Sequence, residues 1–431
     1  MNSVAFHTLG CRVNQYDTQA MLELFRARGY VVVPFSDDAD VYVINTCTVT
    51  GTGDKKSLQL ARRVLREHPA SELVLCGCLA QRMGEELLSL GPRLVLGTQR
   101  RNEVVDLLEK AVNEDIRLCA VTSLASVPFE PLVISGQQDH TRCDLKIQEG
   151  CNNHCTYCII PSVRGPIRSR PPEEIRAEAA RLAAAGYREI VITGIHLTSY
   201  GRDLQGRPSL LEALGEVQKA EGILRIRLGS LEPVIATRAF AEGLLALPAI
   251  CPQFHLALQS GSETVLRRMK RRYTAQMYLE SVQALRSVFP ECAITTDILT
   301  GFPGETEAEF EQTRQMIREV GFARIHVFPF SAREGTEAAH MPGQLSTKEK
   351  EARARILIAD GQQTARAYER GMLGKVRSVL IEEIEDGVAR GYTPEYIPVF
   401  LPANGLTSGQ LVNVHLRTLE DTGMTGEILT D

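Results

Sequence analysis

The 431-residue sequence lacks several features that would mark whole classes of protein. It has no uninterrupted apolar run of the roughly 18 residues that a membrane-spanning helix needs. Its first residues have neither the basic segment nor the long apolar segment of a secretory signal. Low-complexity tracts and short-period repeats are also missing, which argues against a disordered or solenoid protein. These absences predict a globular, cytoplasmic protein with no membrane partner.

The sequence also lacks a strong excess of positive or negative charge. Lysine and arginine total 48 against 53 aspartate and glutamate residues, and the resulting net charge of -5 neither favours nor excludes nucleic acid. Cysteine, in contrast, is plentiful, with 11 residues. An odd number of thiols in a reducing compartment argues against a disulfide framework, so clustered cysteines are more consistent with metal binding or redox chemistry.

The pattern of apolar runs divides the chain into three predicted domains. Residues 1–118 alternate strands (4–8, 41–45, 73–76, 94–96) with helices (16–28, 54–67, 81–90, 102–112), which predicts a parallel βα sheet. Residues 119–138 collect Ser, Pro, Gly and Gln, as a linker does. Residues 139–368 contain six further βα repeats, which predict a partial (β/α)6 barrel. Residues 369–431 hold short β runs and predict a small all-β barrel.

The strongest chemical signal is the segment Cys151-Asn-Asn-His-Cys155-Thr-Tyr-Cys158, just after the first predicted strand of the second domain. Structural zinc sites use four ligands, usually in Cys-x-x-Cys pairs. Three thiolates leave one iron of a 4Fe-4S cluster open to a chelating substrate. The alternative is a zinc knuckle with His154 as fourth ligand, but His154 would then have to share one tetrahedron with the adjacent Cys155.

Three cysteines of the first domain occupy matching positions. Cys11, Cys47 and Cys78 each follow a predicted strand and precede a predicted helix. Loops of that kind open at one edge of a parallel sheet, where helix N-termini favour negative charge. The spacing fits three buried apolar cysteines equally well. Cys76 is the nearest rival of Cys78, and we expect it to point to the opposite face. The remaining cysteines fit buried apolar positions: Cys119, Cys143, Cys251 and Cys292.

These motifs together resemble a known family. A Cys-x-x-x-Cys-x-aromatic-Cys loop after the first strand of a (β/α)6 series is typical of the radical S-adenosylmethionine superfamily. The segments TLGCRVNQYDT (8–18), NTCTVT (45–50) and CGCLAQR (76–82), followed by that loop and a β-rich tail, resemble the methylthiotransferases over essentially the whole chain. The tail is similar to a TRAM domain, a β-barrel that helps to hold RNA.

The resemblance implies two 4Fe-4S clusters. One binds S-adenosyl-L-methionine at its open iron and, reduced by a flavodoxin- or ferredoxin-like one-electron donor, cleaves it to a 5′-deoxyadenosyl radical. The other delivers sulfur. The implied metal ligands are Cys151, Cys155 and Cys158 for the first cluster and Cys11, Cys47 and Cys78 for the second. Contacts to S-adenosyl-L-methionine are expected from Tyr157, Thr193, Gly194, Ser230, Glu232, Gln259 and Asp297, mostly at strand ends, where barrel enzymes carry their functional groups. No catalytic side chain is assigned beyond the cluster ligands.

Within the family, the chain looks most like the branch that modifies tRNA at C2 of N6-threonylcarbamoyladenosine, 3′ to the anticodon. The residues that suggest this lie in 145–151, 159–165, 168–170, 193–196, 325–330 and 391–397. Two alternatives keep the chemistry but change the substrate to isopentenyladenosine in tRNA or to an aspartate of a ribosomal protein. A third is a metal-stabilised RNA-binding protein without catalysis.

We expect a monomer that binds a tRNA anticodon stem-loop. Three basic runs are candidates for phosphate contacts, in residues 55–63, 164–170 and 267–272. Tyr392, Thr393 and Tyr396 of the tail are candidates for contact with an unstacked base.

Overall fold

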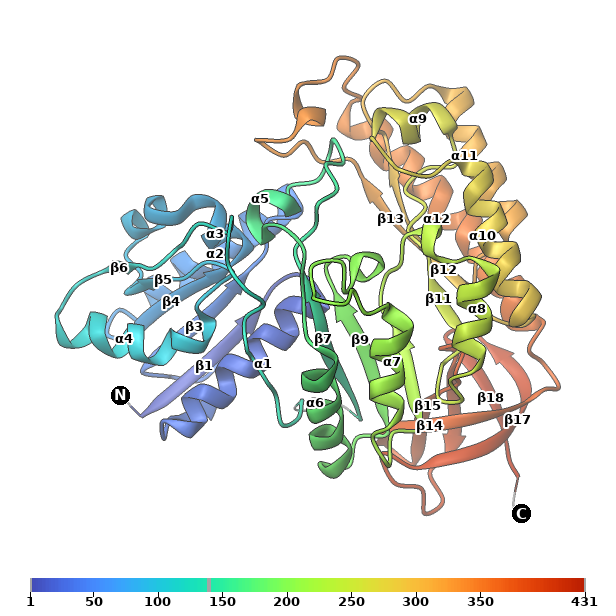
Figure 1. The fold of residues 1–431 in the computed structure, drawn as a ribbon, viewed down its shortest axis with the longest axis horizontal. Helices are drawn as coiled ribbons and strands as arrows, with labels where there is room; N and C mark the ends of the chain where they lie inside the picture. The colour runs from blue at the N-terminus through green and yellow to red at the C-terminus, as the bar shows by residue number, and fades with distance from the viewer. Residues whose placement is uncertain (1, 138–140, 430–431) are drawn as a thin grey trace.

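The structure is a computed structural model that describes residues 2–137 and 141–429. Its amino-terminal part is a six-stranded parallel sheet in the order β2-β1-β3-β4-β5-β6 (Figure 1). The strands are β1 (Ser3–Thr8), β2 (Val31–Val33), β3 (Val41–Thr46), β4 (Glu72–Gly77), β5 (Leu94–Val95) and β6 (Leu118–Cys119). The helices are α1 (Arg12–Ala27), α2 (Gly51–Glu67), α3 (Cys78–Met83) and α4 (Val104–Asn113). The strand order reverses between β1 and β3, and ligands of open α/β sheets bind at such a switch point.

The predicted parallel sheet is confirmed, with differences at its margins. All six residues of β3 are buried, because helices cover both faces of the sheet. The two short strands β2 and β6 were not predicted, since two or three residues carry no readable periodicity. The helix predicted over residues 81–90 starts earlier, at Cys78, and continues as a 3-10 segment, Gly84–Leu90.

The central part is a partial barrel of six parallel strands, as predicted. These are β7 (Arg142–Glu149), β9 (Glu189–Gly194), β10 (Arg225–Leu228), β11 (Gln253–His255), β12 (Ala293–Thr300) and β13 (Arg324–Pro329). Each strand neighbours the preceding one in the chain, and isolated bridges join β10 to the segments around β11. The short β8 (Arg168–Ser169) pairs antiparallel with β7 at the opposite edge from β9.

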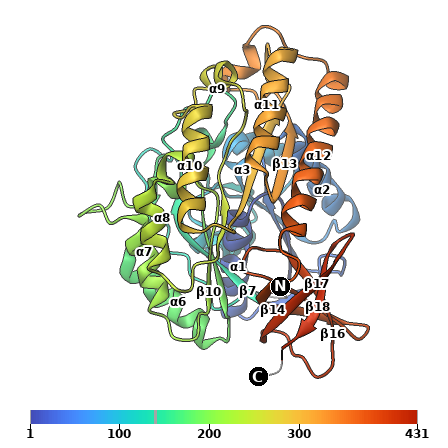
Figure 2. The same ribbon diagram turned by 90° about the vertical axis from the view of Figure 1, so that its right-hand side faces the viewer.

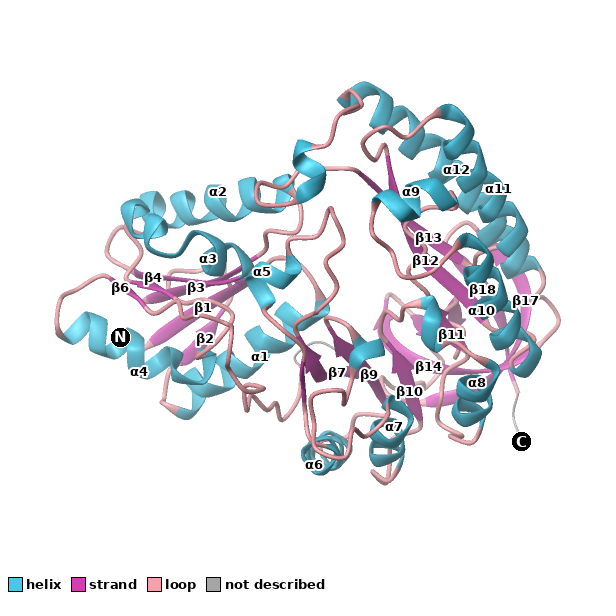
Figure 3. Cartoon of the chain, turned by 45° about the horizontal axis from the view of Figure 1, so that its top comes forward, coloured by secondary structure: helices cyan, strands magenta, loops and turns pink. Residues whose placement is uncertain are grey.

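Helices cover the outer face of this barrel. They are α6 (Pro172–Ala184), α7 (Leu210–Gln218), α8 (Arg238–Leu245), α10 (Ala275–Val288), α11 (Glu307–Val320) and α12 (Thr347–Arg370), with the short α5 (Ile160–Arg164) and α9 (Glu263–Arg268) near the strand ends. Figure 2 shows α10, α11 and α12 side by side on that face. The inner face opens toward the amino-terminal sheet (Figure 3).

The carboxyl-terminal part is a closed five-stranded barrel in the order β14-β15-β16-β18-β17. Its strands are β14 (Val376–Glu385), β15 (Val388–Tyr392), β16 (Pro398–Pro402), β17 (Leu411–Glu420) and β18 (Gly423–Ile428). The all-β prediction is confirmed, although β18 was not predicted. This barrel is tied to β10, since Arg225 donates hydrogen bonds to backbone oxygens of Ser378 and Tyr392. None of the helices in residues 2–137 and 141–429 is both long and apolar enough to span a membrane.

Candidate functional site

A cavity of about 910 Å³ lies where the three parts of the chain meet. The amino-terminal part lines it with the loop that joins β1 to α1. The partial barrel contributes the loop 151–158 and side chains from β7 and from β9 to β13, and the carboxyl-terminal barrel contributes Tyr396.

Most of the predicted site residues line this cavity. All of the positions expected to contact S-adenosyl-L-methionine are there: Tyr157, Thr193, Gly194, Ser230, Glu232, Gln259 and Asp297. Of the six expected metal ligands, four line it: Cys11, Cys151, Cys155 and Cys158. Cys47 and Cys78 do not line it. The structure therefore brings these positions together, and their binding roles stay predictions.

Backbone contacts shape the loop that carries Cys151, Cys155 and Cys158. Gly150 has a φ of +71°, and a Cβ there would lie 1.9 Å from the carbonyl oxygen of Pro166, so only glycine can begin this loop. The backbone N–H of Cys151 donates to Gly165, and that of Cys158 donates to Cys155 over 3.0 Å. The loop is thus held at both ends before any metal binds.

An arginine connects this loop to the expected cofactor contacts. Arg271 donates from Nη1 to Cys155 Sγ over 3.1 Å and from Nη2 to Glu232 Oε1 over 2.7 Å. Asn153 donates to the same carboxylate oxygen over 3.0 Å, and His196 lies 3.0 Å from the other one. Burial alone would raise the pKa of Glu232, but the hydrogen bond from His196 and the charge of Arg271 hold it below its ordinary value.

No metal or cofactor role was predicted for Arg271, Asn153 or His196. Arg271 was grouped with a basic run expected to meet phosphate, and its side chain is only 7% exposed, so that prediction is wrong for Arg271. Asn153 lies within the cysteine loop, and His196 lies just beyond the end of β9. These two positions are the features of the sequence that could have indicated a role for them in the site.

Cys11, Cys47 and Cys78 follow β1, β3 and β4, which are three neighbouring strands of the amino-terminal sheet. Cys11 is the N-cap residue of α1, and Cys78 is the first residue of α3. Gly10, at a φ of +105°, allows its loop to pass against Cys47, because a Cβ there would be 3.1 Å from Cys47 Sγ. Cys76 instead belongs to the core beneath β4, where its thiol donates to Ile44 O over 3.7 Å. It therefore lies in a different core from Cys78, which packs on α5.

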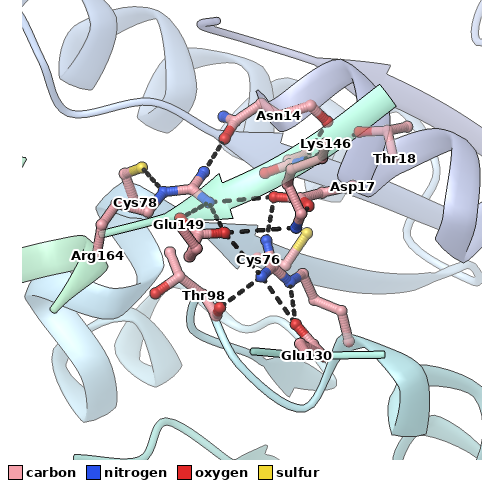
Figure 4. Close-up of polar contacts among 12 residues, drawn as sticks. Asn14, Asp17, Thr18, Cys76, Cys78, Thr98, Glu130, Lys146, Glu149 and Arg164 are labelled. Carbon is pink, nitrogen blue, oxygen red and sulfur yellow. Dashed lines mark hydrogen bonds and ion pairs between the residues drawn. The ribbon is translucent and has the colours of Figure 1, made fainter. Parts of the chain in front are cut away.

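A buried ionic network joins the two cysteine-bearing parts (Figure 4). Arg164, the last residue of α5, donates from Nε to Cys78 Sγ over 3.2 Å. Its Nη1 lies 3.1 Å from Asp17 and 3.0 Å from Glu149. Lys146 and Arg101 also pair with Asp17. Burial would raise the pKa of Asp17, but the surrounding Arg101, Lys146 and Arg164 lower it below its ordinary value.

The donor sets fit iron–sulfur clusters. Burial raises the pKa of Cys78 to about 11 and that of Cys158 to about 12, so these thiols become thiolates only when metal displaces their protons. One sulfur of each trio accepts a charged N–H, an arrangement that stabilises anionic clusters. His154, the fourth ligand that a zinc knuckle would need, is exposed. The zinc alternative gains no support.

Several residues expected to meet RNA are buried instead. Arg164, Arg168 and Arg170 are at most 4% exposed, so the prediction of phosphate contacts for that run is wrong. Thr393 is fully buried, which excludes it from base contact. Tyr392 and Tyr396 stack on each other with ring centroids 4.7 Å apart. Tyr396 also adopts a strained φ of +72° where it lines the cavity, and such strain concentrates at functional sites.

Comparisons with known proteins agree with this architecture. Residues 3–97 match the model of the uncharacterized protein family UPF0004, and residues 145–317 match the radical SAM superfamily. The solved structure of the radical S-adenosylmethionine methyltransferase TsrM from Kitasatospora setae superimposes with a TM-score of 0.58 at 13% identity, covering 79% of this chain and 77% of that one. At that identity it shows the fold alone.

Curated relatives match nearly the full length. The threonylcarbamoyladenosine tRNA methylthiotransferase MtaB of Bacillus subtilis is 41% identical, over 96% of this chain and 94% of its own. The protein of the same name from Thermotoga maritima is 35% identical, over 98% and 96%. A tRNA-2-methylthio-N(6)-dimethylallyladenosine synthase from Symbiobacterium thermophilum is 34% identical, over 99% and 94%.

Fold, cysteine loop and cavity thus define an enzyme of the radical S-adenosylmethionine class, which uses a 4Fe-4S cluster and S-adenosyl-L-methionine. Within that class the chain belongs to the methylthiotransferase family, and the resemblance seen in its motifs to the threonylcarbamoyladenosine branch is confirmed.

Proposed function

We propose that this protein attaches a methylthio group to C2 of N6-threonylcarbamoyladenosine in tRNA, 3′ to the anticodon. The observation that carries the proposal is that Cys11 of one trio and Cys151, Cys155 and Cys158 of the other line the same cavity. Chemistry begun at one trio can then meet sulfur held at the other without the substrate leaving. The named relatives supply the substrate class.

Each part of the site has a proposed role. Cys151, Cys155 and Cys158 would hold the cluster that binds S-adenosyl-L-methionine, and this pair, when bound and reduced, supplies the radical that removes hydrogen from C2. Arg271 and Glu232 would orient groups at that cluster. The expected contacts at the strand ends would hold the methionine and ribose groups, and the cavity walls would exclude water.

The second trio has a proposed role of its own. Cys11, Cys47 and Cys78 would hold the second 4Fe-4S cluster, the source of the sulfur. Arg164 would fix that trio against the first through its contact with Cys78. We further propose a monomer reduced by a flavodoxin- or ferredoxin-like donor, with the exposed Lys55, Lys56, Arg62 and Arg63 of α2 as phosphate contacts.

The test is nucleoside mass spectrometry of tRNA from cells with and without the gene for this protein. We expect 2-methylthio-N6-threonylcarbamoyladenosine to disappear on deletion and to return with the intact gene but not with a Cys155→Ala variant. Loss of the isopentenyl nucleoside, or of a methylthiolated aspartate in a ribosomal protein, would instead point to one of the alternative substrates. Anaerobically purified protein should carry about eight irons, four for each cluster.

A further inference from the structure

A polar wall on β11, β12 and β13 extends the cavity away from the cysteine loops. His255, Thr295 and Arg324 form one row across these strands, because His255 pairs with Thr295 and Thr295 with Arg324. Asp297 and His326 form the next pair toward the carboxyl ends of β12 and β13. Paired residues on neighbouring strands point to the same face of a sheet. All five line the cavity, and Figure 3 shows the three strands adjacent to one another.

The arginines that line the cavity differ in whether each forms an ion pair with a carboxylate of the protein. Four of them have carboxylate partners: Arg12 with Asp144, Arg142 with Glu382, Arg227 with Glu189, and Arg271 with Glu232. Arg324, the fifth, has no ion-pair partner among the residues that the structure describes, and it is exposed to the cavity. The nearby carboxylate of Asp297 faces His255, whose Nε2 is 3.4 Å away. The wall therefore carries one guanidinium without an ion-pair partner in the described ranges, and the carboxylate of Asp297 lies in the next row, beside His255.

His326 adds no positive charge beside Arg324. Burial and the charge of Arg324 lower the pKa of His326, so at neutral pH its ring is an uncharged hydrogen-bonding group. A guanidinium with an imidazole on the same strand face suits a small planar anion, because guanidinium N–H groups bind carboxylates in a bidentate manner.

The two tRNA nucleosides considered as substrates differ at the N6 substituent. An isopentenyl group is apolar, whereas a threonylcarbamoyl group ends in a carboxylate and a hydroxyl. An apolar group packed over Arg324 would desolvate a cation without pairing it, which costs free energy, whereas a carboxylate would complete the pair. C2 and N6 lie on different sides of the pyrimidine ring, so a base with C2 toward the cysteine loops directs its substituent to another wall.

We propose that Arg324, assisted by His326, binds the carboxylate of the threonylcarbamoyl group and so selects this substrate over isopentenyladenosine. This inference rests on the proposed function and adds the residue that reads the substituent. His326, which lies in the segment 325–330 that resembles the branch, lines the cavity beside Arg324.

The test uses the reconstituted holoenzyme under anaerobic conditions. Arg324→Gln, Arg324→Lys and a control, Arg318→Gln on the exposed face of α11, are each assayed with anticodon stem-loop RNA carrying threonylcarbamoyladenosine. We expect Arg324→Gln to raise KM about ten- to a hundredfold with little change in kcat, because a charged hydrogen bond is worth roughly 1.5–3 kcal/mol. Arg324→Lys should have a KM closer to that of the wild type. With RNA in which the carboxylate of the threonylcarbamoyl group is methyl-esterified, the wild type should show a KM as high as that of Arg324→Gln.

The outcomes separate the two proposals. If the wild type methylthiolates this RNA and Arg324→Gln has the same KM as Arg318→Gln, the carboxylate subsite is wrong and the proposed function stands. If the wild type acts on isopentenyladenosine RNA and leaves threonylcarbamoyladenosine RNA unmodified, the proposed function itself fails. Cleavage of S-adenosyl-L-methionine without RNA should be equal in all variants, which excludes a general effect on folding or cluster content.

Discussion

The two cysteine trios each include one sulfur that accepts a hydrogen bond from an arginine, yet the surroundings differ. At Cys78, Arg164 is fully buried between the two domains and is shared with Asp17, Glu149 and Asn14. At Cys155, Arg271 faces the cavity, with Glu232 as its carboxylate partner and Tyr273 beneath its guanidinium.

The difference indicates two uses of the same contact. Arg164 belongs to the interface between the amino-terminal sheet and the partial barrel, so it fixes the position of one trio relative to the other. Arg271 belongs to the site itself, since Glu232 and Cys155 both line the cavity. Loss of Arg164 should therefore mainly lower the stability of the folded protein, whereas loss of Arg271 should mainly lower the rate of the reaction.

The largest effects are expected from substitutions of the cysteines, because the two trios should support different steps of the reaction. Cys155→Ala should abolish formation of deoxyadenosine, because one ligand of the proposed radical-generating cluster is gone. Cys47→Ala should retain deoxyadenosine formation but yield no methylthiolated RNA. Chromatographic assay of both products from each variant checks this, with Cys292→Ala, a buried core cysteine, as the control. Methylthiolated RNA from Cys47→Ala would refute a sulfur-delivering role for that trio.

Arg164→Met should cost about 3–5 kcal/mol of stability, because it leaves the carboxylates of Asp17 and Glu149 with one cation fewer in a buried network. Denaturant unfolding of the purified protein measures the loss. Arg66→Met is the matched control, since Arg66 is 70% exposed and pairs with its neighbour Glu67 at the surface. Equal midpoints for the two variants would show that the network does not hold the domains together.

Arg271→Gln should lower the rate of deoxyadenosine formation about ten- to a hundredfold, the equivalent of a charged hydrogen bond of roughly 1.5–3 kcal/mol. It should also lower the reduction potential of the cluster, because the positive charge and N–H···S contact that favour the reduced form are removed. Arg271→Lys should restore part of the potential. A potential that stays unchanged in Arg271→Gln, measured by redox titration with electron paramagnetic resonance, would leave Arg271 with a structural role only.

The smallest effect is expected at Tyr396, which lies in neither cysteine site. Tyr396→Gly and Tyr396→Ala both lose the stacking on Tyr392 and the contacts with Arg142 and Arg227. Only glycine relieves the strain of the φ of +72°, so Tyr396→Gly should be more stable than Tyr396→Ala by about 1 kcal/mol. Thermal unfolding of the two variants measures this difference, and cluster spectra should be unchanged in both. The reverse order of stability would show that this backbone is not strained.

Much of the fold could be read from local patterns. Apolar runs predicted the longer strands of the amino-terminal sheet and of the partial barrel. The strands that were not predicted are β2 and β6, which are too short to show a period, and β18, which contains two glycines that interrupt the pattern.

The cysteine loop 151–158 was determined by the sequence alone, because consecutive residues bring their own ligands together wherever the chain folds. The three-part architecture followed from local patterns of this kind, and the family and its chemistry followed from the resemblance of these motifs to known proteins. Only the tertiary structure decided that Cys11 and Cys47 are neighbours and that Cys76 belongs to a different core from Cys78. It also decided that Arg164 and Arg271 contact sulfur rather than phosphate, and that Arg324 has no ion-pair partner within residues 2–137 and 141–429. The physical reason is that contacts between residues far apart in the chain depend on the order of the strands and on how the domains pack. The local sequence around each residue does not specify these arrangements.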